Sequence, residues 1–387
     1  METTTFTDQS SRLASANPGG ASVLAAPAGS LILALPAAAP EFILTGQVRP
    51  GEPLAAAWGR LADELAVRQA ELLGLMIYAP VALQPQIKRV MRVILGKTDW
   101  PVTWVDADDC EGRPLPGMQA FAVSGRPVSR VRLGDMVVGS VYDDGAARFC
   151  LLGGLGPADA SVTAPAQARQ TFDRLAAALE SAGFALGDVV RTWFYNERIL
   201  DWYGDFNLVR TSCYDGVKFR TGSLPASTGI GTRQSGGAAL TVAAWAMQPL
   251  TGAAHAREIA SPLQCPAPVY GSSFSRAMEM ESAGWRRLLV SGTASIHPDG
   301  RTAWVGDPRR QIDLSMDVVA AILDSRGMTW RDVTRATAYF QRPRFRSHFE
   351  EWTHDHGWDD LPVVSLLCEI CRHDLLFEIE VDARIRS

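Results

Sequence analysis

Hydrophobic and polar positions follow the same order twice in the second half of the chain. Residues 173–195 read DRLAAALESAGFALGDVVRTWFY, and residues 317–340 read DVVAAILDSRGMTWRDVTRATAYF. In each stretch, apolar residues at helical spacing lead to a glycine, Gly183 or Gly327, at the position where helices often end in a left-handed residue. A run of β-branched and aromatic residues follows. The pattern predicts an amphipathic helix and then a strand in each copy.

The two stretches are related by one constant offset. Asp173 and Asp317 lie 144 positions apart, and the same offset aligns further identical residues without a gap. These are the pairs Gly183 and Gly327, Asp188 and Asp332, Arg191 and Arg335, and Tyr195 and Tyr339. Self-similarity at a fixed spacing indicates repeated structural units. In both copies we expect a hairpin before this stretch, and a second helix and two closing strands after it.

A fainter third copy precedes these two. Residues 41–125 show the same order of strand and helix signals, without the shared residue identities. Strands that alternate with helices able to cover one face predict an α+β fold of repeated units. Three units in one chain are compatible with a pseudo-threefold arrangement. The expected division is a mobile leader at 1–38, units at 39–125, 126–250 and 270–387, and a linker at 251–269.

The composition is that of a globular protein and limits the partners. The chain has 387 residues, of which 47% are hydrophobic and 20% charged, with a net charge of −5. This charge argues against a chain-wide surface for nucleic acid. The longest apolar run, residues 21–40, is interrupted by Pro27 and Pro36, so no membrane span is expected. Six scattered cysteines fit a reducing compartment, and we expect a cytoplasmic protein.

The last strand carries the strongest candidate for chemistry. Alternation over LLFEIE places Glu378 and Glu380 on one face, opposite Phe377 and Ile379. Buried carboxylates are costly unless they are paired or functional. One possibility is that this face of the strand is exposed to solvent, or that each carboxylate forms an ion pair with an arginine. The other is that one of the two residues is a general acid/base whose pKa is raised by burial.

The earlier copy helps to separate these alternatives. Its matching strand reads LTVAAWA, which we expect to place Val242 opposite Glu378 and Ala244 opposite Glu380. The repeated unit therefore does not need these carboxylates for its construction. This favours a functional role in the last copy alone.

Other motifs suggest metal or nucleotide sites only weakly. Cys368 and Cys371 form a C-x-x-C with His373 nearby, but residues i and i+3 of a strand point to opposite faces, and no second C-x-x-C exists. No metal site is expected. The glycine-rich stretches at 153–156 and 229–237 lack the strand–turn–helix context of a nucleotide site. Arginines and phenols around Tyr195 suit the recognition of carboxylates, or belong to an aromatic core.

Longer stretches resemble a known family. SGTASIHPDG at 291–300 and the closing EIE strand are similar to the Rid-like (reactive-intermediate deaminase) superfamily. Residues 191–207, 270–281 and 368–380 resemble a narrower group, the chorismatases, which carry Rid-like units in one chain and cleave chorismate. The resemblance covers residues 118–387 well and 40–117 in outline.

The resemblance implies a reaction and site residues. The acid/base glutamate of the family falls on Glu378, and a cysteine seven residues earlier, here Cys371, is typical of the branch that forms 3-hydroxybenzoate. Chorismate would release pyruvate without a cofactor or metal, with Cys371 acting as a nucleophile or proton relay. For the two substrate carboxylates we expect Tyr195 and Arg198, then Arg220, and less strongly Arg372.

Alternatives stay open at this point. A mixed 3-/4-hydroxybenzoate product, or hydrolysis to a dihydroxycyclohexadiene carboxylate, would use the same substrate. A Rid-type imine deaminase would normally hold its substrate with an arginine in a P-A-R-[ST] strand, but the matching stretches read PAST (225–228) and PVVS (362–365). A non-catalytic ligand-binding protein is the remaining possibility. Three units would suit a monomeric pseudo-trimer, and two a homo-oligomer.

Overall fold

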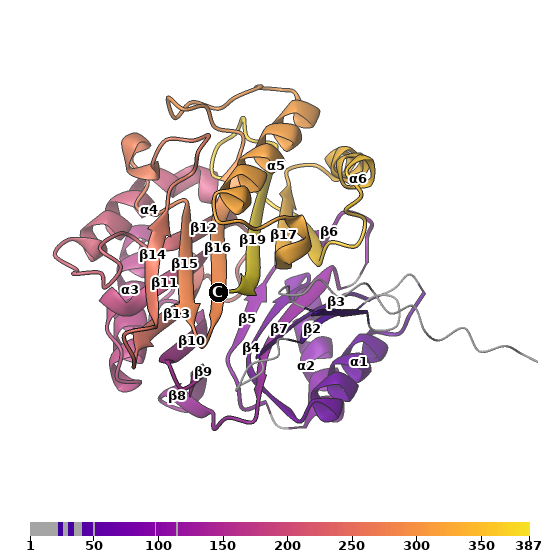
Figure 1. The fold of residues 1–387 in the computed structure, drawn as a ribbon, viewed down its shortest axis with the longest axis vertical. Helices are drawn as coiled ribbons and strands as arrows, with labels where there is room; N and C mark the ends of the chain where they lie inside the picture. Colours follow the sequence, from indigo (N-terminus) through magenta and orange to yellow (C-terminus); the bar gives the residue numbers. More distant parts are fainter. Residues whose placement is uncertain (1–21, 26–29, 35–40, 49–50, 97, 114) are drawn as a thin grey trace, which may run out of the picture.

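Three mixed sheets with helices on their outer sides build the molecule (Figure 1). The computed structural model describes residues 22–25, 30–34, 41–48, 51–96, 98–113 and 115–387. The first sheet has the order β1-β2-β3-β7-β4-β5, the second β12-β11-β13-β10-β9-β8, and the third β14-β15-β16-β19-β17-β18-β6. Each sheet with its two long helices is called the first, second or third unit below.

The first unit follows the order expected from residues 41–125. Its elements are β1 (Ser22–Ala25), β2 (Ser30–Ala34), β3 (Glu41–Gly46), α1 (Leu54–Val67), β4 (Ala70–Tyr78), α2 (Gln84–Leu95), β5 (Val102–Val105) and β7 (Gly117–Ser124). The short strand β6 (Asp108–Asp109) leaves this unit and pairs with β18 of the third sheet. The first unit and the third sheet are thus also linked by a shared strand.

The second and third units contain the repeat. The second consists of β8 (Ser129–Leu133), β9 (Met136–Asp143), β10 (Ala147–Leu155), α3 (Ala164–Ser181), β11 (Val189–Asn196), α4 (Ile199–Tyr214), β12 (Ala226–Gly231) and β13 (Leu240–Pro249). The third consists of β14 (His255–Ile259), β15 (Ala277–Ser282), β16 (Trp285–Ala294), α5 (Pro308–Asp324), β17 (Val333–Phe340), α6 (Arg346–Asp355), β18 (Val363–Leu367) and β19 (Phe377–Arg386).

The units share one strand pairing. In each, the strand after the first helix lies parallel to the strand after the second helix: β4 with β5, β11 with β12, and β17 with β18. The closing strand, β7, β13 or β19, pairs antiparallel between this pair and the preceding hairpin or strand. The α+β fold of repeated units predicted from the sequence is confirmed.

The repeated helices end as their sequences predict. Gly183 and Gly327 have φ angles of 75° and 66°, the left-handed region that glycine adopts without a Cβ penalty. After each glycine, a backbone N–H reaches back to the helix, from Phe184 to Leu179 at 2.8 Å and from Met328 to Leu323 at 2.9 Å. These bonds satisfy carbonyls that the helix ends would otherwise leave unpaired.

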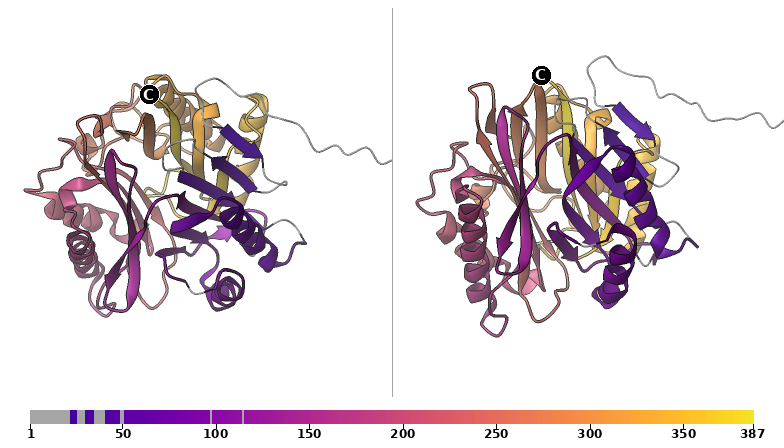
Figure 2. Two further views of the ribbon diagram at one scale, coloured as in Figure 1. Left: turned by 60° about the horizontal axis from the view of Figure 1, so that its bottom comes forward. Right: turned by 90° about the horizontal axis from the view of Figure 1, so that it is seen from below.

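One core lies between the sheets and one under the helices of each unit. The central core includes Tyr78, Tyr195 and Tyr339, one from each unit and all fully buried. Figure 2 shows the helices lying outside the sheets from two further directions. Burial of both faces of each sheet explains why the strands read as nearly continuous apolar runs.

The register corrects one expectation from the sequence. Tyr195 pairs with Thr241, and its counterpart Tyr339 pairs with Glu378. The residue that corresponds to Glu378 is therefore Thr241, one position before Val242. By the same register, Ala243 corresponds to Glu380. The conclusion is unchanged, because the second unit carries no carboxylate at either position.

The expected leader and the expected linker both contain strands. Residues 22–25 and 30–34 of the expected leader form β1 and β2, and β2 pairs with β3. These strands cover the β3 edge, which would otherwise leave backbone groups unpaired. The rest of 1–38 lies outside the described residues. The expected linker 251–269 contains β14, the edge strand of the third sheet. The unit boundaries themselves stay a proposal.

Candidate active site

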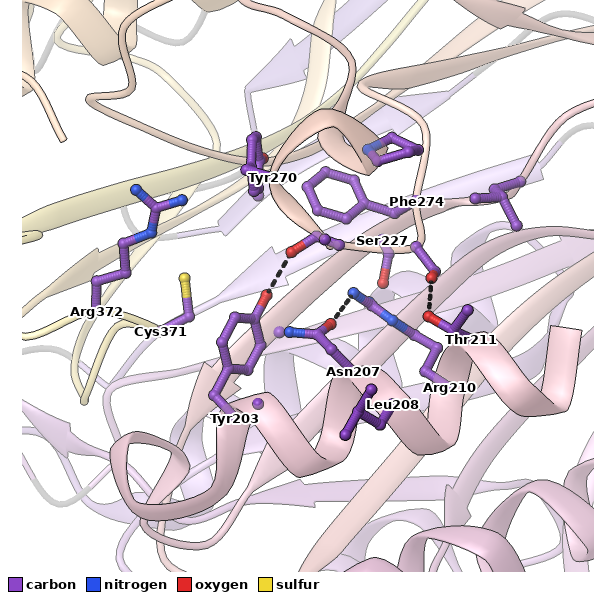
Figure 3. A pocket seen from close by; sticks show the side chains of 18 of the residues that line it. Tyr203, Asn207, Leu208, Arg210, Thr211, Ser227, Tyr270, Phe274, Cys371 and Arg372 are labelled. Carbon is purple, nitrogen blue, oxygen red and sulfur yellow. Dashed lines mark hydrogen bonds between the residues drawn. The ribbon is translucent and has the colours of Figure 1, made fainter. Parts of the chain in front are cut away.

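A cavity of about 990 Å³ lies where the second and third units meet. Helix α4 and strand β12 form one side, and the segment before β15, strand β16 and the chain from 371 to 378 form the other (Figure 3). Side chains that matter for chemistry line it from both units: Tyr203, Asn207, Arg210, Ser227, Tyr270, Phe274, Arg276, Cys371, Arg372 and Glu378. Glu378, Cys371 and Arg372, predicted from the sequence, are therefore brought together.

Glu378 faces the cavity because of the strand alternation in β19. Its neighbours Phe377 and Ile379 enter the core under the helices of the third unit, so the intervening side chain points to the interface between the units. Glu378 is only 5% exposed. Burial first, and then the charge of Glu380, raise the pKa of Glu378 to about 8. At neutral pH this side chain is a neutral carboxylic acid, able to donate a proton.

Glu380 has the opposite surroundings two positions later. Its carboxylate contacts Arg335 at 2.7 Å and Arg191 at 2.8 Å, and all three side chains are fully buried. Burial would raise the pKa of Glu380, but the two guanidinium groups lower it overall. Among the alternatives from the sequence, pairing with arginine thus applies to Glu380, while Glu378 keeps an unpaired carboxyl among the described residues.

The Cys371 thiol lies in the same cavity. Burial first, and then the nearby Glu378, raise the pKa of Cys371 to about 12, against the opposing effect of the Arg372 charge. The sulfur therefore remains a thiol at neutral pH. Of the two roles considered for it, sharing a proton fits a thiol, whereas nucleophilic attack needs the thiolate.

Two arginines in the cavity wall were not predicted from the sequence. Arg210 is 2% exposed, and its side-chain bond is to the amide oxygen of Asn207 at 2.6 Å. Arg276 is 4% exposed and donates to the Cys265 carbonyl at 2.9 Å. Neither forms an ion pair within the described part of the chain, and Arg210 Nε and Arg276 Nη2 have no hydrogen-bond partner there.

Buried cations without an acidic partner are unusual, because desolvation must be compensated. Aromatic faces compensate part of it: the guanidinium carbon of Arg210 lies 5.3 Å from the Phe206 ring centre, and that of Arg276 lies 5.3 Å from Tyr270. Two guanidinium groups without an acidic partner in the wall of a cavity are suited to bind an anionic ligand. A sequence signal existed for one of them, since Arg210 lies seven residues, or two helical turns, after Tyr203 on α4.

Arg372 is fixed at the rim of the cavity. Its Nη1 donates to the Gly300 carbonyl at 2.9 Å, and its guanidinium carbon lies 5.1 Å from the centre of the Tyr270 ring. Tyr270 thus contacts the guanidinium groups of both Arg372 and Arg276. The cavity presents three guanidinium groups around one neutral acid.

Three expected substrate-binding residues lie elsewhere, which corrects the sequence interpretation. Tyr195 points into the central core, where its hydroxyl lies 3.8 Å from the Met76 sulfur. The Arg198 side chain is 74% exposed and pairs with Asp201. Arg220 is bound to a carboxylate outside the cavity, that of Asp188 at 2.7 Å. Strand alternation buries the tyrosine, and the two arginines lie in surface loops.

The described residues contain no group of three or more His, Cys, Asp or Glu side chains arranged for a metal ion. Cys368 lies next to the central core and does not line the cavity, so the C-x-x-C contributes one sulfur to it. No helix in the described ranges combines the length and apolar character needed to cross a bilayer.

Known proteins with this fold include a chorismatase. Its crystal structure matches 89% of this chain and 98% of its own with a TM-score of 0.62 and 21% identity. A 3-hydroxybenzoate synthase from Streptomyces hygroscopicus is 26% identical in an alignment over 224 residues. The match covers 51% of this chain and 64% of that protein, under two thirds of its length. The YjgF product of E. coli matches 34% of this chain with a TM-score of 0.27.

No protein-family model matches the chain. The resemblance to chorismatases stated from the sequence is confirmed, and the fold is shared along most of the chain.

Proposed function

We propose that this protein converts chorismate to 3-hydroxybenzoate and pyruvate, with Glu378 as the general acid. The observation that carries the proposal is a buried, neutral carboxylic acid with no partner among the described residues, in a cavity with two unpaired arginines. The names of the similar proteins, a chorismatase and a 3-hydroxybenzoate synthase, support the choice of substrate. Cys371, seven residues before the acid, supports the choice of product.

The charges of the cavity fit a dianion. Chorismate carries one carboxylate on its ring and one on its enolpyruvyl group. Arg210 and Arg276 line the cavity without an acidic partner among the described residues, and Arg372 adds a third guanidinium at the rim. Arginine binds carboxylates through paired, charge-assisted hydrogen bonds. A bound dianion would therefore supply the acidic partners that the arginines lack.

The reaction then needs proton transfers and the shift of one oxygen between neighbouring ring carbons. Glu378 donates its proton to the methylene carbon of the enolpyruvyl ether, which leaves a positive charge on the ether carbon and weakens the bonds to the ring. The two products together contain all atoms of chorismate, so no water is consumed. The bond between the ether oxygen and ring carbon 3 breaks, and this oxygen leaves as the carbonyl of pyruvate. The neighbouring 4-hydroxyl oxygen then closes onto carbon 3 and gives its proton to the Glu378 carboxylate. When the bond from this oxygen to carbon 4 opens, carbon 3 loses its hydrogen as a proton, the oxygen gains one, and the ring becomes aromatic as 3-hydroxybenzoate. Cys371, next to Glu378, can share the proton that returns to the acid.

The test is incubation with chorismate, followed by chromatography of the aromatic product and enzymatic assay of pyruvate. We expect 3-hydroxybenzoate and pyruvate in equal amounts, and loss of a general acid in Glu378→Gln should lower the rate about 10²–10⁴-fold. A folded Glu378→Gln protein with wild-type turnover would exclude Glu378 as the acid. A dihydroxycyclohexadiene carboxylate instead of an aromatic product would identify a hydrolase.

A further inference from the structure

We infer that Thr228, whose side chain lies outside the cavity, is a positioning residue that holds Glu378 in place through the backbone of Gly292. The neighbours of Thr228 on β12, Ser227 and Gly229, line the cavity, so strand alternation directs the threonine to the other side. Thr228 is 1% exposed. It therefore has no contact with a ligand in the cavity, and its effect must pass through other residues.

The Thr228 hydroxyl accepts hydrogen bonds from two different elements. It accepts from Arg191 Nη2 at 2.7 Å and from the Gly292 backbone N–H at 3.0 Å. The hydroxyl also lies near the Glu380 carboxylate and helps to lower the pKa of that group. A hydroxyl has two acceptor positions, so it can accept no further hydrogen bond. Thr228 thus links the buried Arg191–Glu380 pair of both units to the backbone of β16.

Gly292 transmits this link to Glu378. The pairing of β16 with β19 is interrupted by a bulge between Val290 and Thr293, so Gly292 is not held by its neighbouring strand. A Cβ atom on Gly292 would overlap the carboxyl oxygen of Glu378. Because backbone and carboxyl are in contact, a shift of the bulge would move the acid.

The same bulge occurs without an acid at the junction of the first and second units. There Thr103 of β5 accepts from the Gly154 N–H at 3.0 Å, and the β10 bulge lies between Leu152 and Leu155. Thr103 is 2% exposed, nearly as buried as Thr228. The residue in the place of Glu378 is Thr241. Thr103 is therefore a matched control, since it supports the same backbone feature where there is no acid to position.

The kinetic experiment compares Thr228→Val and Thr103→Val in the full-length protein, and it rests on the proposed function. We expect Thr228→Val to lower kcat for pyruvate release about 10²-fold, the loss typical of a misplaced reacting group, with little change in KM. Thr228→Ser, which keeps the hydroxyl, should restore most of kcat, and Thr103→Val should leave kcat unchanged. Equal kcat in folded Thr228→Val and Thr103→Val would overturn the inference.

A second readout needs no substrate. Infrared spectra of the free protein at neutral pH should contain a band of a protonated carboxylic acid that disappears in Glu378→Gln. This band should change frequency in Thr228→Val and stay the same in Thr103→Val. If wild-type protein releases no pyruvate from chorismate, the proposed function fails while this band still tests the inference. An unaltered band in Thr228→Val would contradict it.

Folding is checked by circular dichroism. If Thr228→Val does not fold, Thr228→Cys replaces it, because a thiol keeps the size of serine but forms weaker hydrogen bonds. Its kcat should then lie well below that of Thr228→Ser. Equal values for these two variants would overturn the inference as well.

Discussion

Glu378 and Glu380 lie two residues apart on one face of one strand, yet their surroundings assign them different protonation states. Arg191 and Arg335 hold Glu380 as a carboxylate. Glu378 forms no ion pair among the described residues, and burial with repulsion from Glu380 outweighs the opposing charges of Arg191 and Arg276, which keeps it protonated. Enzymes commonly separate the pKa values of neighbouring carboxyl groups in this way to assign an acid. The division of roles at this site therefore follows from the positions of the arginines.

The raised pKa of Glu378 predicts how stability depends on pH. Between about pH 4.5 and 8 the folded protein binds a proton here that the unfolded chain has lost, so the free energy of unfolding decreases as the pH rises. The slope from one such group is up to about 1.4 kcal/mol per pH unit. Glu378→Gln has no group that titrates there, and should be more stable than the wild type at pH 8.

Urea unfolding of both proteins at several pH values between 5 and 8 measures this difference. The wild-type curve should lose stability relative to the variant as the pH increases. A constant difference across the range would mean that Glu378 has an ordinary pKa in the folded protein.

Arg210 is expected to bind substrate, and Arg198 is not. Arg210→Met should raise KM for chorismate about 10–100-fold, because hydrogen bonds to a charged partner are lost. Its thermal stability should not decrease, since the side chain is a buried cation without an acidic partner among the described residues. Arg198→Met, at an exposed side chain, is the matched control with wild-type KM. An unchanged KM in Arg210→Met would remove this arginine from the substrate site.

At the scale of elements, periodicity predicted the helices and strands well, but not the register. Helix ends at Gly183 and Gly327 and the order of all three units could be read from the sequence. The residue of the second unit that corresponds to Glu378 could not be read from the sequence. Tyr195 and Tyr339 are 144 positions apart, but Thr241 and Glu378 are only 137 apart, because the connecting loops differ in length. Pattern alone does not reveal such a change.

The candidate site was predictable only in part, for a related reason. Glu378 and Cys371 lie in one continuous stretch, residues 368–380, and the sequence of that stretch was enough to identify both as site residues. Arg210 lies on α4 of the second unit and Arg276 just before β15 of the third, so they meet only when the units pack. Tyr195 and Arg198 are near each other in sequence, but strand alternation and a loop separate them.

The β16 bulge offers a test at the scale of elements. In Gly292→Ala, the added methyl group overlaps the end of the Glu378 side chain, which can rotate away at little cost to the fold. We expect nearly unchanged thermal stability, but a loss of pyruvate release of about 10²-fold. Gly59→Ala on α1, where a methyl group meets nothing within 4 Å, should retain full activity. Wild-type activity in Gly292→Ala would show that the acid tolerates this shift.

At the scale of the whole molecule, buried charges connect the three units at their common centre. Arg335 of β17 contacts Glu380 at 2.7 Å, Asp382 at 3.0 Å and the Gln119 side chain of the first unit at 2.8 Å. Arg191 joins the same network from the second unit. The position of β19, and with it that of Glu378, thus depends on contacts from all three units.

Removal of Arg335 should destabilise the entire protein. Arg335→Met leaves two fully buried carboxylates without their main partner, which typically costs about 3–5 kcal/mol. Arg198→Ala breaks an exposed ion pair and should change stability by less than about 1 kcal/mol. Chemical denaturation, followed by circular dichroism, distinguishes the two. A loss in Arg335→Met no larger than in Arg198→Ala would mean that this centre contributes little to holding the units together.

The central claim is that protonated Glu378 delivers a proton to the enolpyruvyl group of chorismate. It is tested most directly by turnover in D₂O, with mass spectrometry of the pyruvate and chromatography of the aromatic product. The account predicts 3-hydroxybenzoate with an equal amount of pyruvate that carries one deuterium in its methyl group, and almost none of either from Glu378→Gln. Unlabelled pyruvate, or undiminished formation of labelled pyruvate by the folded variant, would contradict it.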